Sequence, residues 1–408
     1  MSGPDTIGEW KKQGRGWRDG MRYNVISSDG HVDLAYLPPE LFVENASTSL
    51  VARMPRVVDK GEGPEWWADG MYLAVSGRRT KALLTPENET RIGRIAETGF
   101  YEDAAQGRPR STDPDLRLAD QDRDGVDAEV IYGLTFIGGR LMAGYNFPGG
   151  TRVTAPNPEV VEEVFRIYNN WMADFCRKSP GRFAGLACLP NNDPTTAAAE
   201  LRRAASMGLR GAELDVHGAG LPVYYEDWDP LWEASQECGM PISFHLLNWG
   251  PREPKAPDVP KYNRIWWTMD MVLSPLFGAE FLASILLSGA CKRFPGFKFV
   301  LGECGAAWVP FMLDRLDYEC TGFPGLEASP VEYWRRQGHT TYQDEDLVAD
   351  LIGKIGEDNV MWGSDYPHPD SVWPDSQQII EKNLGRVRDT GLRRKVVCEN
   401  AGRLYGFI

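Results

Sequence analysis

The segment Asn359-Val-Met-Trp-Gly-Ser-Asp365-Tyr-Pro-His368 predicts a buried β-strand that ends at a carboxylate, where a loop begins. A similar arrangement lies near the N-terminus, where the apolar strand Tyr23-Asn-Val-Ile-Ser-Ser28 leads into Asp29-Gly30-His31. A third strand, Pro241-Ile-Ser-Phe-His245, ends in a histidine. Strand ends on one face of a repeating β/α fold converge on the active site, so these side chains are candidates for one shared site.

Between these strands the chain alternates short apolar segments with amphipathic ones. Strands are predicted at residues 126–133, 182–190, 209–216, 241–245, 297–303 and 359–365, with a faint one before Tyr342. Helices are predicted at residues 158–177, 193–207, 227–237, 278–293 and 307–319, with two more after the last strand. Strand–helix units in series imply a parallel sheet, and about eight strands fit a closed barrel of the TIM class better than an open sheet.

Two stretches interrupt this alternation. Residues 40–118 show no strand–helix pattern, so we interpret them as a large insertion after strand 1 that shields the site, with a hairpin arm at Met71-Tyr-Leu-Ala-Val75. Residues 248–266, rich in proline and tryptophan, form a loop insertion after strand 5. One barrel with such insertions uses all 408 residues, so we predict a single domain over residues 1–408 that includes the 40–118 insertion or cap.

The charge balance excludes two classes of partner. The chain has 58 acidic and 44 basic residues, a formal net charge of −14. Nucleic acid and anionic membrane surfaces both require a basic footprint, so we expect a small-molecule partner instead. No run approaches the roughly 18 consecutive apolar residues of a membrane-spanning helix.

The N-terminus and the cysteines indicate the compartment. Residues 1–12 lack the apolar core of a signal peptide, so a cytoplasmic location is expected. The seven cysteines are scattered and contain no Cys-x-x-Cys pair. This pattern favours reduced thiols that are mostly buried.

The residues at the three strand ends are typical of a metal site. Asp29 and His31 are two positions apart, so on an extended strand they share a face and can reach one ion. Together with His245 and Asp365 they provide nitrogen and oxygen ligands suited to Zn, Fe or Mn. Each also has a structural alternative: a turn or helix cap for Asp29 and Asp365, and a backbone-bonded core histidine for His245.

Six segments, taken in order, carry a family resemblance. They are Ser28-Asp-Gly-His-Val32, Asp122-Arg-Asp-Gly-Val-Asp-Ala-Glu-Val130, Glu226-Asp-Trp-Asp-Pro-Leu-Trp-Glu-Ala234, Gly302-Glu-Cys-Gly-Ala-Ala-Trp-Val-Pro-Phe311, Met361-Trp-Gly-Ser-Asp-Tyr-Pro-His368 and Glu399-Asn-Ala-Gly-Arg-Leu-Tyr-Gly406. The chain resembles the amidohydrolase superfamily, in the amidohydrolase-2 branch related to aminocarboxymuconate-semialdehyde decarboxylase. The 40–118 insertion matches no motif of the branch.

This resemblance implies a distorted (β/α)8 barrel with a divalent metal at its C-terminal face. By position, Asp29 and His31 correspond to the strand-1 ligands, His245 to the strand-5 ligand and Asp365 to the strand-8 carboxylate. In such enzymes the last aspartate binds the metal and relays a proton from the attacking water. The departure lies on strand 6, where decarboxylating relatives commonly have a catalytic histidine and this chain has Glu303.

Several roles are open for Glu303. It could be a metal ligand, a partner that orients His31 or His245, or an acid–base group. It could also be a structural carboxylate that pairs with Arg315 or caps the helix near Trp308. If Glu303 and a strand-4 carboxylate such as Glu213 both face inward, a second metal becomes possible, and a carboxylate-rich pair favours Fe or Mn over Zn.

The loops after the strands supply candidates for substrate contact. These are His217, Trp249, Arg252 and His368. Each has an alternative, namely a surface position for His217, loop core or an oligomer interface for the loop containing Trp249 and Arg252, and support of Asp365 for His368. Cys304, with no clear base beside it, is interpreted as a buried structural thiol.

The leading functional hypothesis is a metal-dependent hydrolase in which Asp365, Glu303 and His245 are catalytic. The metal would activate water to cleave an amide, ester, thioester, lactone or a carbon–carbon bond next to a carbonyl in a small carboxylic or aromatic substrate. One alternative is a metal-dependent, non-oxidative decarboxylase of an aromatic or enoic acid, and another is a non-catalytic barrel scaffold. A homo-oligomer, specifically a dimer, is also expected.

Overall fold

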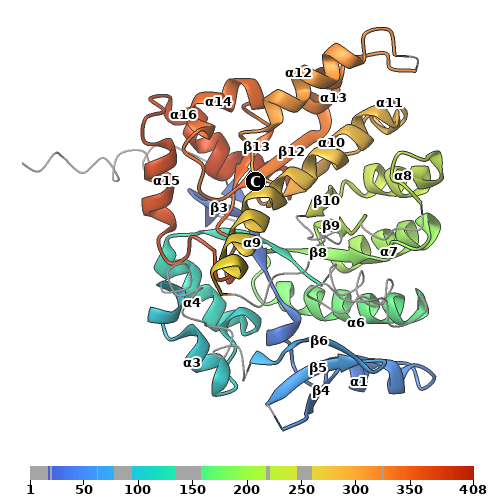
Figure 1. Cartoon of the computed structure of the whole chain (residues 1–408), viewed down its shortest axis with the longest axis vertical. Coiled ribbons are helices and arrows are strands. Elements are labelled where there is room, and N and C mark those ends of the chain that lie inside the picture. The colour runs from blue at the N-terminus through green and yellow to red at the C-terminus, as the bar shows by residue number, and fades with distance from the viewer. Residues whose placement is uncertain are drawn as a thin grey trace, which may run out of the picture.

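The barrel is built on an eight-stranded parallel sheet (Figure 1). The structure is a computed structural model that describes residues 17–18, 21–61, 63–77, 94–134, 158–216, 221–245, 260–323 and 325–408. The strands follow one another in chain order around the sheet. They are β3 (Ile26–His31), β7 (Ala128–Tyr132), β8 (Phe183–Leu189), β9 (Gly211–Leu214), β10 (Ile242–His245), β11 (Phe299–Gly302), β12 (Gly338–Tyr342) and β13 (Val360–Trp362).

The two edge strands of this sheet meet, so the barrel is nearly closed. A parallel bridge joins Gly30 to Tyr366, and the backbone N–H of Asp365 donates to the Asp29 carbonyl at 2.8 Å. The hydroxyls of Ser27 and Ser364 lie 3.1 Å apart across the same seam. The predicted TIM-like barrel is therefore confirmed, and its first and last strands lie side by side.

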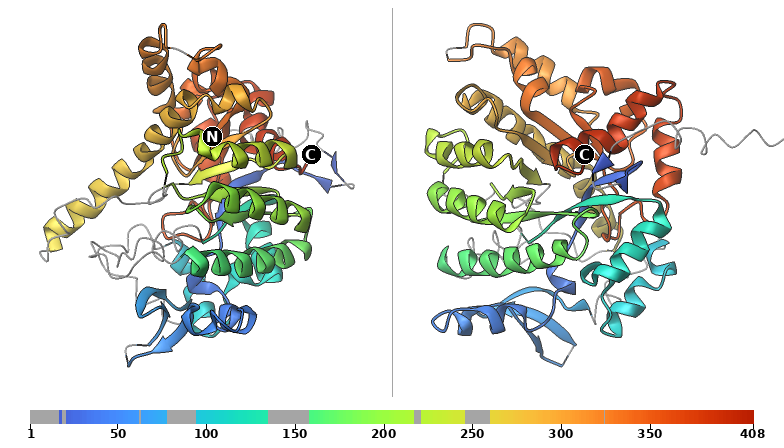
Figure 2. Two further views of the ribbon diagram at one scale, coloured as in Figure 1. Left: turned by 90° about the vertical axis from the view of Figure 1, so that its right-hand side faces the viewer. Right: turned by 180° about the vertical axis from the view of Figure 1, so that it is seen from behind.

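Helices cover the outside of the sheet (Figure 2). They are α6 (Pro158–Arg177), α7 (Pro194–Met207), α8 (Asp229–Cys238), α9 (Pro260–Leu273), α10 (Gly278–Leu287), α11 (Ala290–Arg293), α12 (Val309–Glu319), α13 (Pro330–Gln337), α14 (Val348–Ile355), α15 (Ser376–Leu384), α16 (Thr390–Arg394) and α17 (Asn400–Leu404). The ends of α7 show how local sequence sets these bounds. Asp193 caps its N-terminus by accepting from Thr196 N at 2.8 Å, and Gly208 ends it with a φ of +94°.

Two helical segments follow the last strand, as the sequence predicts, and they are α15 and a continuous stretch from Thr390 to Leu404. From Thr390 the backbone runs through α16, a π-helical turn (η9, Lys395–Glu399) and α17, so this region follows α15 as three connected pieces. The predicted helix at 278–293 is also divided, because Gly289 adopts a φ of +76° between α10 and α11. A π-helical turn or a break within a helix depends on tertiary packing, and the hydrophobic periodicity of the sequence does not reveal it.

The insertion after the first barrel strand forms a layer of its own. The predicted hairpin arm is a three-stranded antiparallel sheet of β4 (Arg56–Asp59), β5 (Pro64–Ala68) and β6 (Met71–Val75). In Figure 1 this sheet lies with α1 (Leu41–Asn45) next to α6, at the side of the barrel. The second half, with α3 (Phe100–Ala105) and α4 (Pro114–Asp124), packs near the barrel seam, where the Phe100 ring lies 5.9 Å from Tyr366.

One helical stretch, Arg264–Leu287, is apolar and long enough to cross a membrane on length and composition alone. It is interrupted by a 3-10 turn (η8, Ser274–Phe277) that contains Pro275. Its second half is α10, whose Leu282 and Ile285 are fully buried in the barrel core. We interpret the stretch as part of the barrel wall, with only its first half, α9, standing at the surface.

Candidate metal centre

Five predicted side chains meet at the carboxyl ends of the barrel strands. Asp29 and His31 lie in β3, His245 ends β10, Glu303 follows β11 directly, and Asp365 lies three residues beyond the end of β13. His31 Nε2 lies 3.2 Å from Asp29 Oδ1 and 3.1 Å from Asp365 Oδ1. His245 Nε2 lies 3.5 Å from both Asp29 Oδ1 and Glu303 Oε2. The geometry thus brings all five proposed ligands to one point.

The chemistry of these atoms fits a cation. In the part of the chain that the structure describes, Asp29 Oδ1, His31 Nε2 and Asp365 Oδ2 are buried without a well-directed hydrogen bond. Buried polar atoms are nearly always satisfied, so a cluster of unsatisfied lone-pair atoms requires an explanation. Two overlapping ligand groups share His31, each with its donor atoms within 4.8 Å of one another. Imidazole and carboxylate donors at this spacing suit a divalent ion.

Backbone turns aim two of the carboxylates inward. Glu303 has a φ of +51° and Asp365 a φ of +60°, a left-handed conformation that is uncommon for residues other than glycine. Thr341 holds the first of these turns: its Oγ1 accepts from Glu303 N at 2.7 Å and donates to Asp29 Oδ2 at 3.1 Å. Strained backbone of this kind persists where surrounding contacts over-determine it, as they do here.

The aspartates and the glutamate of the cluster have pKa values shifted in opposite directions. Burial opposes the charge of Asp29, but the adjacent imidazoles of His245 and His31 outweigh it and lower the pKa of Asp29. Burial and His368 likewise oppose a charge on His31, yet Asp29 and Asp365 raise its pKa to about 9. Glu303 behaves oppositely, because burial raises its pKa well above the usual range and the charge of Asp365 adds to the effect. The balance of burial and neighbouring charges therefore favours the ionised form of the two aspartates and the protonated form of Glu303.

His368 lies at the open side of the cluster. Its Nδ1 is 2.8 Å from Asp365 Oδ1, its Nε2 is 3.4 Å from Asp33 Oδ1, and its ring stacks on His31 with centroids 4.0 Å apart. Burial opposes its charge, but Asp365 and Asp33 raise the pKa of His368 well above its usual range. The side chain of His368 is 24% exposed and that of Glu303 is 14%, against 0% for Asp365 and 1% for Asp29. The aspartates thus lie deep in the cluster, and Glu303 and His368 are more exposed than they are.

Sequence reasoning missed several supporting residues. Thr341 lies on the faint seventh strand. Asp33 continues the i, i+2 spacing of Asp29 and His31, and this spacing is the sequence signal that could have identified it. Tyr132 packs on both histidines, with ring centroids 5.6 Å from His31 and 4.5 Å from His245. Arg117 donates to the His31 carbonyl at 2.8 Å and pairs with Glu129 at 3.0 Å, which supports the end of β3.

The structural alternatives for the strand-6 and strand-4 carboxylates are also resolved. Arg315 pairs with Glu319 rather than with Glu303. Before the helix near Trp308, the backbone N–H groups of Ala306 and Ala307 donate to Glu345 rather than to Glu303. Glu213 accepts a hydrogen bond from the backbone N–H of Gly133, and neither of the ligand groups found among the described residues includes it. The second-metal hypothesis that depended on Glu213 therefore has no support in the geometry.

Cys304 and three predicted substrate contacts remain. The Cys304 thiol donates to the Gly302 carbonyl at 3.1 Å, and burial raises its pKa well above the usual range, as expected for a structural thiol. His217, Trp249 and Arg252 lie outside the described residues.

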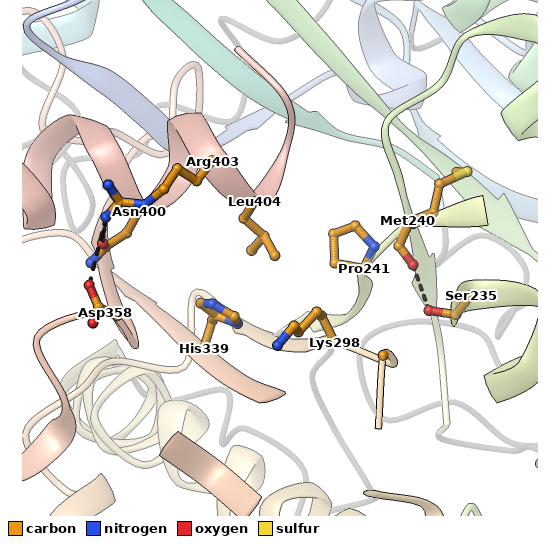
Figure 3. A pocket seen from close by; sticks show the side chains of 11 residues that line it. Ser235, Met240, Pro241, Lys298, His339, Asp358, Asn400, Arg403 and Leu404 are labelled. Atoms are coloured by element: carbon orange, nitrogen blue, oxygen red, sulfur yellow. Dashed lines mark hydrogen bonds and ion pairs between the residues drawn. The ribbon is translucent and has the colours of Figure 1, made fainter. Parts of the chain in front are cut away.

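A separate cavity lies at the opposite end of the barrel, before the strands begin (Figure 3). It has a volume of about 400 Å³ and is lined in part by Pro241, Lys298, His339 and Arg403. Residues at the N-terminal ends of barrel strands usually serve stability. Burial lowers the pKa of His339 to about 4, so this histidine is neutral. His339 thus lies in this cavity and away from the metal cluster.

A parallel α/β barrel with histidine and aspartate ligands at its strand ends defines the class, a metal-dependent barrel enzyme. Within that class, the chain belongs to the amidohydrolase family, whose family model matches residues 139–407. The predicted family resemblance is thereby confirmed, and the match includes His245, Glu303 and Asp365.

Comparison with curated proteins narrows the reaction. The chain is 29% identical over 263 residues to gamma-resorcylate decarboxylase of Rhodococcus jostii, covering 58% of this chain and 77% of that protein. It is 26% identical over 265 residues to 2-amino-3-carboxymuconate-6-semialdehyde decarboxylase of Dictyostelium discoideum, covering 63% and 67%. The leading prediction of a hydrolase is wrong in this light, because these relatives are decarboxylases and support the alternative.

Solved structures agree on the fold. An amidohydrolase from Mycobacterium avium subsp. paratuberculosis superposes with a TM-score of 0.69 at 18% identity, covering 95% of this chain and all of that one. 5-Carboxyvanillate decarboxylase of Sphingomonas paucimobilis gives 0.53 at 28% identity, covering 71% and 82%. A dihydroxybenzoic acid decarboxylase of Polaromonas, solved with manganese and 2-nitroresorcinol, gives 0.59 at 18% identity, covering 94% and 97%.

Proposed function

We propose that this protein is a metal-dependent, non-oxidative decarboxylase of a small aromatic or enoic carboxylic acid. The observation that carries the proposal is the alignment with decarboxylases over about three fifths of the chain, at a site that retains metal-type ligands. A hydroxylated benzoate is the first substrate class to test, because two of these relatives are named as decarboxylases of gamma-resorcylate and of 5-carboxyvanillate. A cytoplasmic location, a single domain and a homodimer remain predictions.

Asp29, His31, His245 and Asp365 are the proposed metal ligands. When bound, the ion would supply positive charge that stabilises anionic oxygens of the substrate. Two imidazoles and two carboxylates suit Mn²⁺ as well as Zn²⁺, and we propose Mn²⁺, the ion present in the Polaromonas structure. The four ligand side chains are nearly fully buried, so the protein positions them before substrate enters.

His368 is proposed to orient the substrate. Its imidazolium is partly exposed, and Asp365 and Asp33 hold it in place from two sides. A cation at the open side of an otherwise acidic cluster attracts the carboxylate or a phenolic oxygen of the substrate. Arg117, although close, already pairs with Glu129 and so cannot serve this purpose.

Glu303 is proposed as the proton donor. Decarboxylation breaks the bond between a carbon and its carboxylate, releases CO2 and leaves an electron pair on that carbon, which then requires a proton. Burial and Asp365 raise the pKa of Glu303, which favours the protonated form that a donor requires. After transfer Glu303 is a carboxylate, and a proton from solvent restores it because its side chain is 14% exposed. A carboxylic acid can thus take the place of the histidine on strand 6.

The test is turnover of Mn²⁺-loaded protein with 2,6-dihydroxybenzoate and related hydroxybenzoates, followed as CO2 release. Glu303→Gln is expected to lower kcat by roughly 10²–10⁴-fold, the usual contribution of a general acid, with metal content unchanged. Glu345→Gln is the matched control, since it alters a partly buried carboxyl group with a raised pKa, whose hydrogen bonds among the described residues come from the backbone N–H groups of Ala306 and Ala307. Full activity of Glu303→Gln would refute its role, and no CO2 from any aromatic or enoic acid would refute the decarboxylase.

A further inference from the structure

The cavity at the N-terminal end of the barrel receives side chains that point inward from two neighbouring strands. His339 shares a face of β12 with Thr341, whose hydroxyl reaches a metal ligand inside the barrel. Lys298 lies directly before β11, on the same face as Gly302, where an added Cβ would meet His245. In the view of Figure 3, Lys298 and His339 lie next to each other along one side of the cavity.

A layer of hydroxyl groups separates this cavity from the metal cluster. Ser243 lies on one face of the chain between Pro241, which lines the cavity, and His245, which belongs to the cluster. Its Oγ is 3.1 Å from the hydroxyl oxygen of Tyr132 and 3.5 Å from that of Tyr405. All three hydroxyl-bearing residues are buried. The cavity is therefore a separate chamber at the other end of the barrel.

Two of the charged residues that line the cavity already have partners. Arg403 Nη1 lies 3.0 Å from Glu399 Oε2, on the preceding turn of the chain. Asp358 Oδ1 lies 3.0 Å from Lys395 Nζ and 3.7 Å from Arg403 Nη2. These pairs balance one another, so neither of the two residues provides a free charge.

The third charged residue of the lining, Lys298, has no carboxylate partner among the described residues. Its ammonium group donates a hydrogen bond to the backbone carbonyl of Arg336, which carries no net charge. Burial lowers the pKa of Lys298, as happens when an ammonium group loses water without gaining an anion. A partly buried cation of this kind is stabilised by any anion that enters the cavity beside it.

We propose that this cavity binds a small organic carboxylate whose anionic group pairs with Lys298. The neutral imidazole of His339 can make one further hydrogen bond to a polar group of the ligand. Apolar side chains line the cavity beside these two residues and can contact the hydrocarbon part of the ligand; they are Met240, Pro241 and Leu404. The volume of about 400 Å³ lies within the roughly 300–1,000 Å³ of small-molecule sites.

The lining favours a carboxylate with an apolar body over other small ions. One unpaired ammonium group matches a single negative charge, and the carboxylate of Asp358 disfavours a more highly charged ion such as inorganic phosphate. Lys298 and Arg403 likewise repel a metal cation. Because the cavity lies away from the metal cluster, this proposal does not depend on the proposed decarboxylase activity.

The first experiment locates the ligand directly. Crystals of the metal-loaded, full-length protein are soaked with 4-bromobenzoate, and the anomalous signal of bromine is mapped. We expect a bromine peak in the cavity, with the carboxylate at Lys298, whether or not a second molecule occupies the metal centre. A peak at the metal centre alone, or no peak, would overturn the proposal and leave the cavity a structural role.

The second experiment measures affinity in solution, by calorimetric titration of the metal-loaded protein with benzoate. Lys298→Met should weaken binding at the cavity by roughly 10–100-fold, the usual effect of losing a hydrogen bond to a charged group. Lys354→Met, at an exposed lysine near the end of α14, is the matched control and should bind benzoate as the wild type does. Unchanged affinity in Lys298→Met would refute the site.

A third variant remains informative even if Lys298→Met fails to fold. Asp358→Asn removes the one negative charge of the lining, so it should tighten benzoate binding by roughly two- to fivefold, a gain that misfolding does not produce. Acetate and inorganic phosphate should both bind more weakly than benzoate. Weaker benzoate binding in Asp358→Asn, or phosphate binding more tightly than benzoate, would refute a carboxylate site.

Discussion

Replacing Thr341 by valine isolates the contact that joins the metal ligands to the strained turn at Glu303. Valine has nearly the shape of threonine, so the change removes the hydroxyl alone. That hydroxyl donates to Asp29 Oδ2 at 3.1 Å and accepts from Glu303 N at 2.7 Å, and all three residues belong to the candidate site. The variant therefore loses the support of one ligand and leaves one backbone N–H without its acceptor.

The expected magnitude follows from these two contacts. A hydrogen bond to a charged group contributes about 1.5–3 kcal/mol, and an unsatisfied buried donor costs about 1–3 kcal/mol. The two contributions sum to about 2.5–6 kcal/mol, so we expect the free energy of unfolding of the metal-free protein to fall by at least about 2.5 kcal/mol. Loss of a residue that orients a ligand typically weakens metal binding by about 10–100-fold.

Two measurements check this prediction, namely denaturant unfolding of the metal-free protein and competition with a chelator for Mn²⁺. Thr340→Val is the matched control on the same strand, since the Thr340 hydroxyl donates to the Gly305 carbonyl at 2.7 Å, away from the ligands. The control should lose stability and keep its metal affinity. The reasoning would be refuted if Thr341→Val bound Mn²⁺ within twofold of wild type. It would also be refuted if Thr340→Val lost as much metal affinity as Thr341→Val.

Two further predictions concern protons and the buried ion pair. Because the pKa of His31 is raised to about 9 in the metal-free protein, the ion must displace a proton at neutral pH. Metal affinity should therefore rise with pH between 6.5 and 8.5, by up to about tenfold per pH unit, when measured by chelator competition; a flat profile would contradict this. Arg117→Met should lower the free energy of unfolding by about 3–5 kcal/mol because it leaves Glu129 charged and unpaired in the core. Arg53 is partly exposed, so Arg53→Met should lower the free energy of unfolding by under about 1 kcal/mol in the same denaturant assay. Equal losses of stability in the two variants would refute the conclusion that burial makes the Arg117–Glu129 pair the more costly one to break.

The sequence predicted the fold well because the fold depends on periodicity and on side chains at strand ends. The helix predicted at 158–177 has those bounds in α6, since its buried apolar face repeats at helical spacing over twenty residues. Asp29, His31, His245 and Asp365 follow apolar strands, and parallel strands place such ends together. Thr341 escaped prediction because β12 has a polar sequence, Gly-His-Thr-Thr-Tyr, with no hydrophobic alternation to mark it.

The reaction could not be predicted in the same way. Hydrolases and decarboxylases can use the same ligand set, so the motifs predict a metal and not the bond that breaks. Glu303 at the position of a catalytic histidine argues against a decarboxylase only if its carboxyl group is ionised, because a carboxylate cannot donate a proton. Its pKa depends on burial and on Asp365, which lies in a later strand and reaches Glu303 only in the folded barrel. Such tertiary electrostatics are absent from local sequence patterns.

The meeting of the first and last strands also has a consequence during protein synthesis. Ser27 and Ser364, whose hydroxyls touch across the barrel seam, are separated by 337 residues. At about 5–20 residues per second, a ribosome requires roughly 20–70 s to add the second partner after the first. Throughout that time Asp29 and His31 have no Asp365 to complete the site. A nascent or prematurely terminated chain that lacks Asp365 therefore cannot assemble the complete metal site.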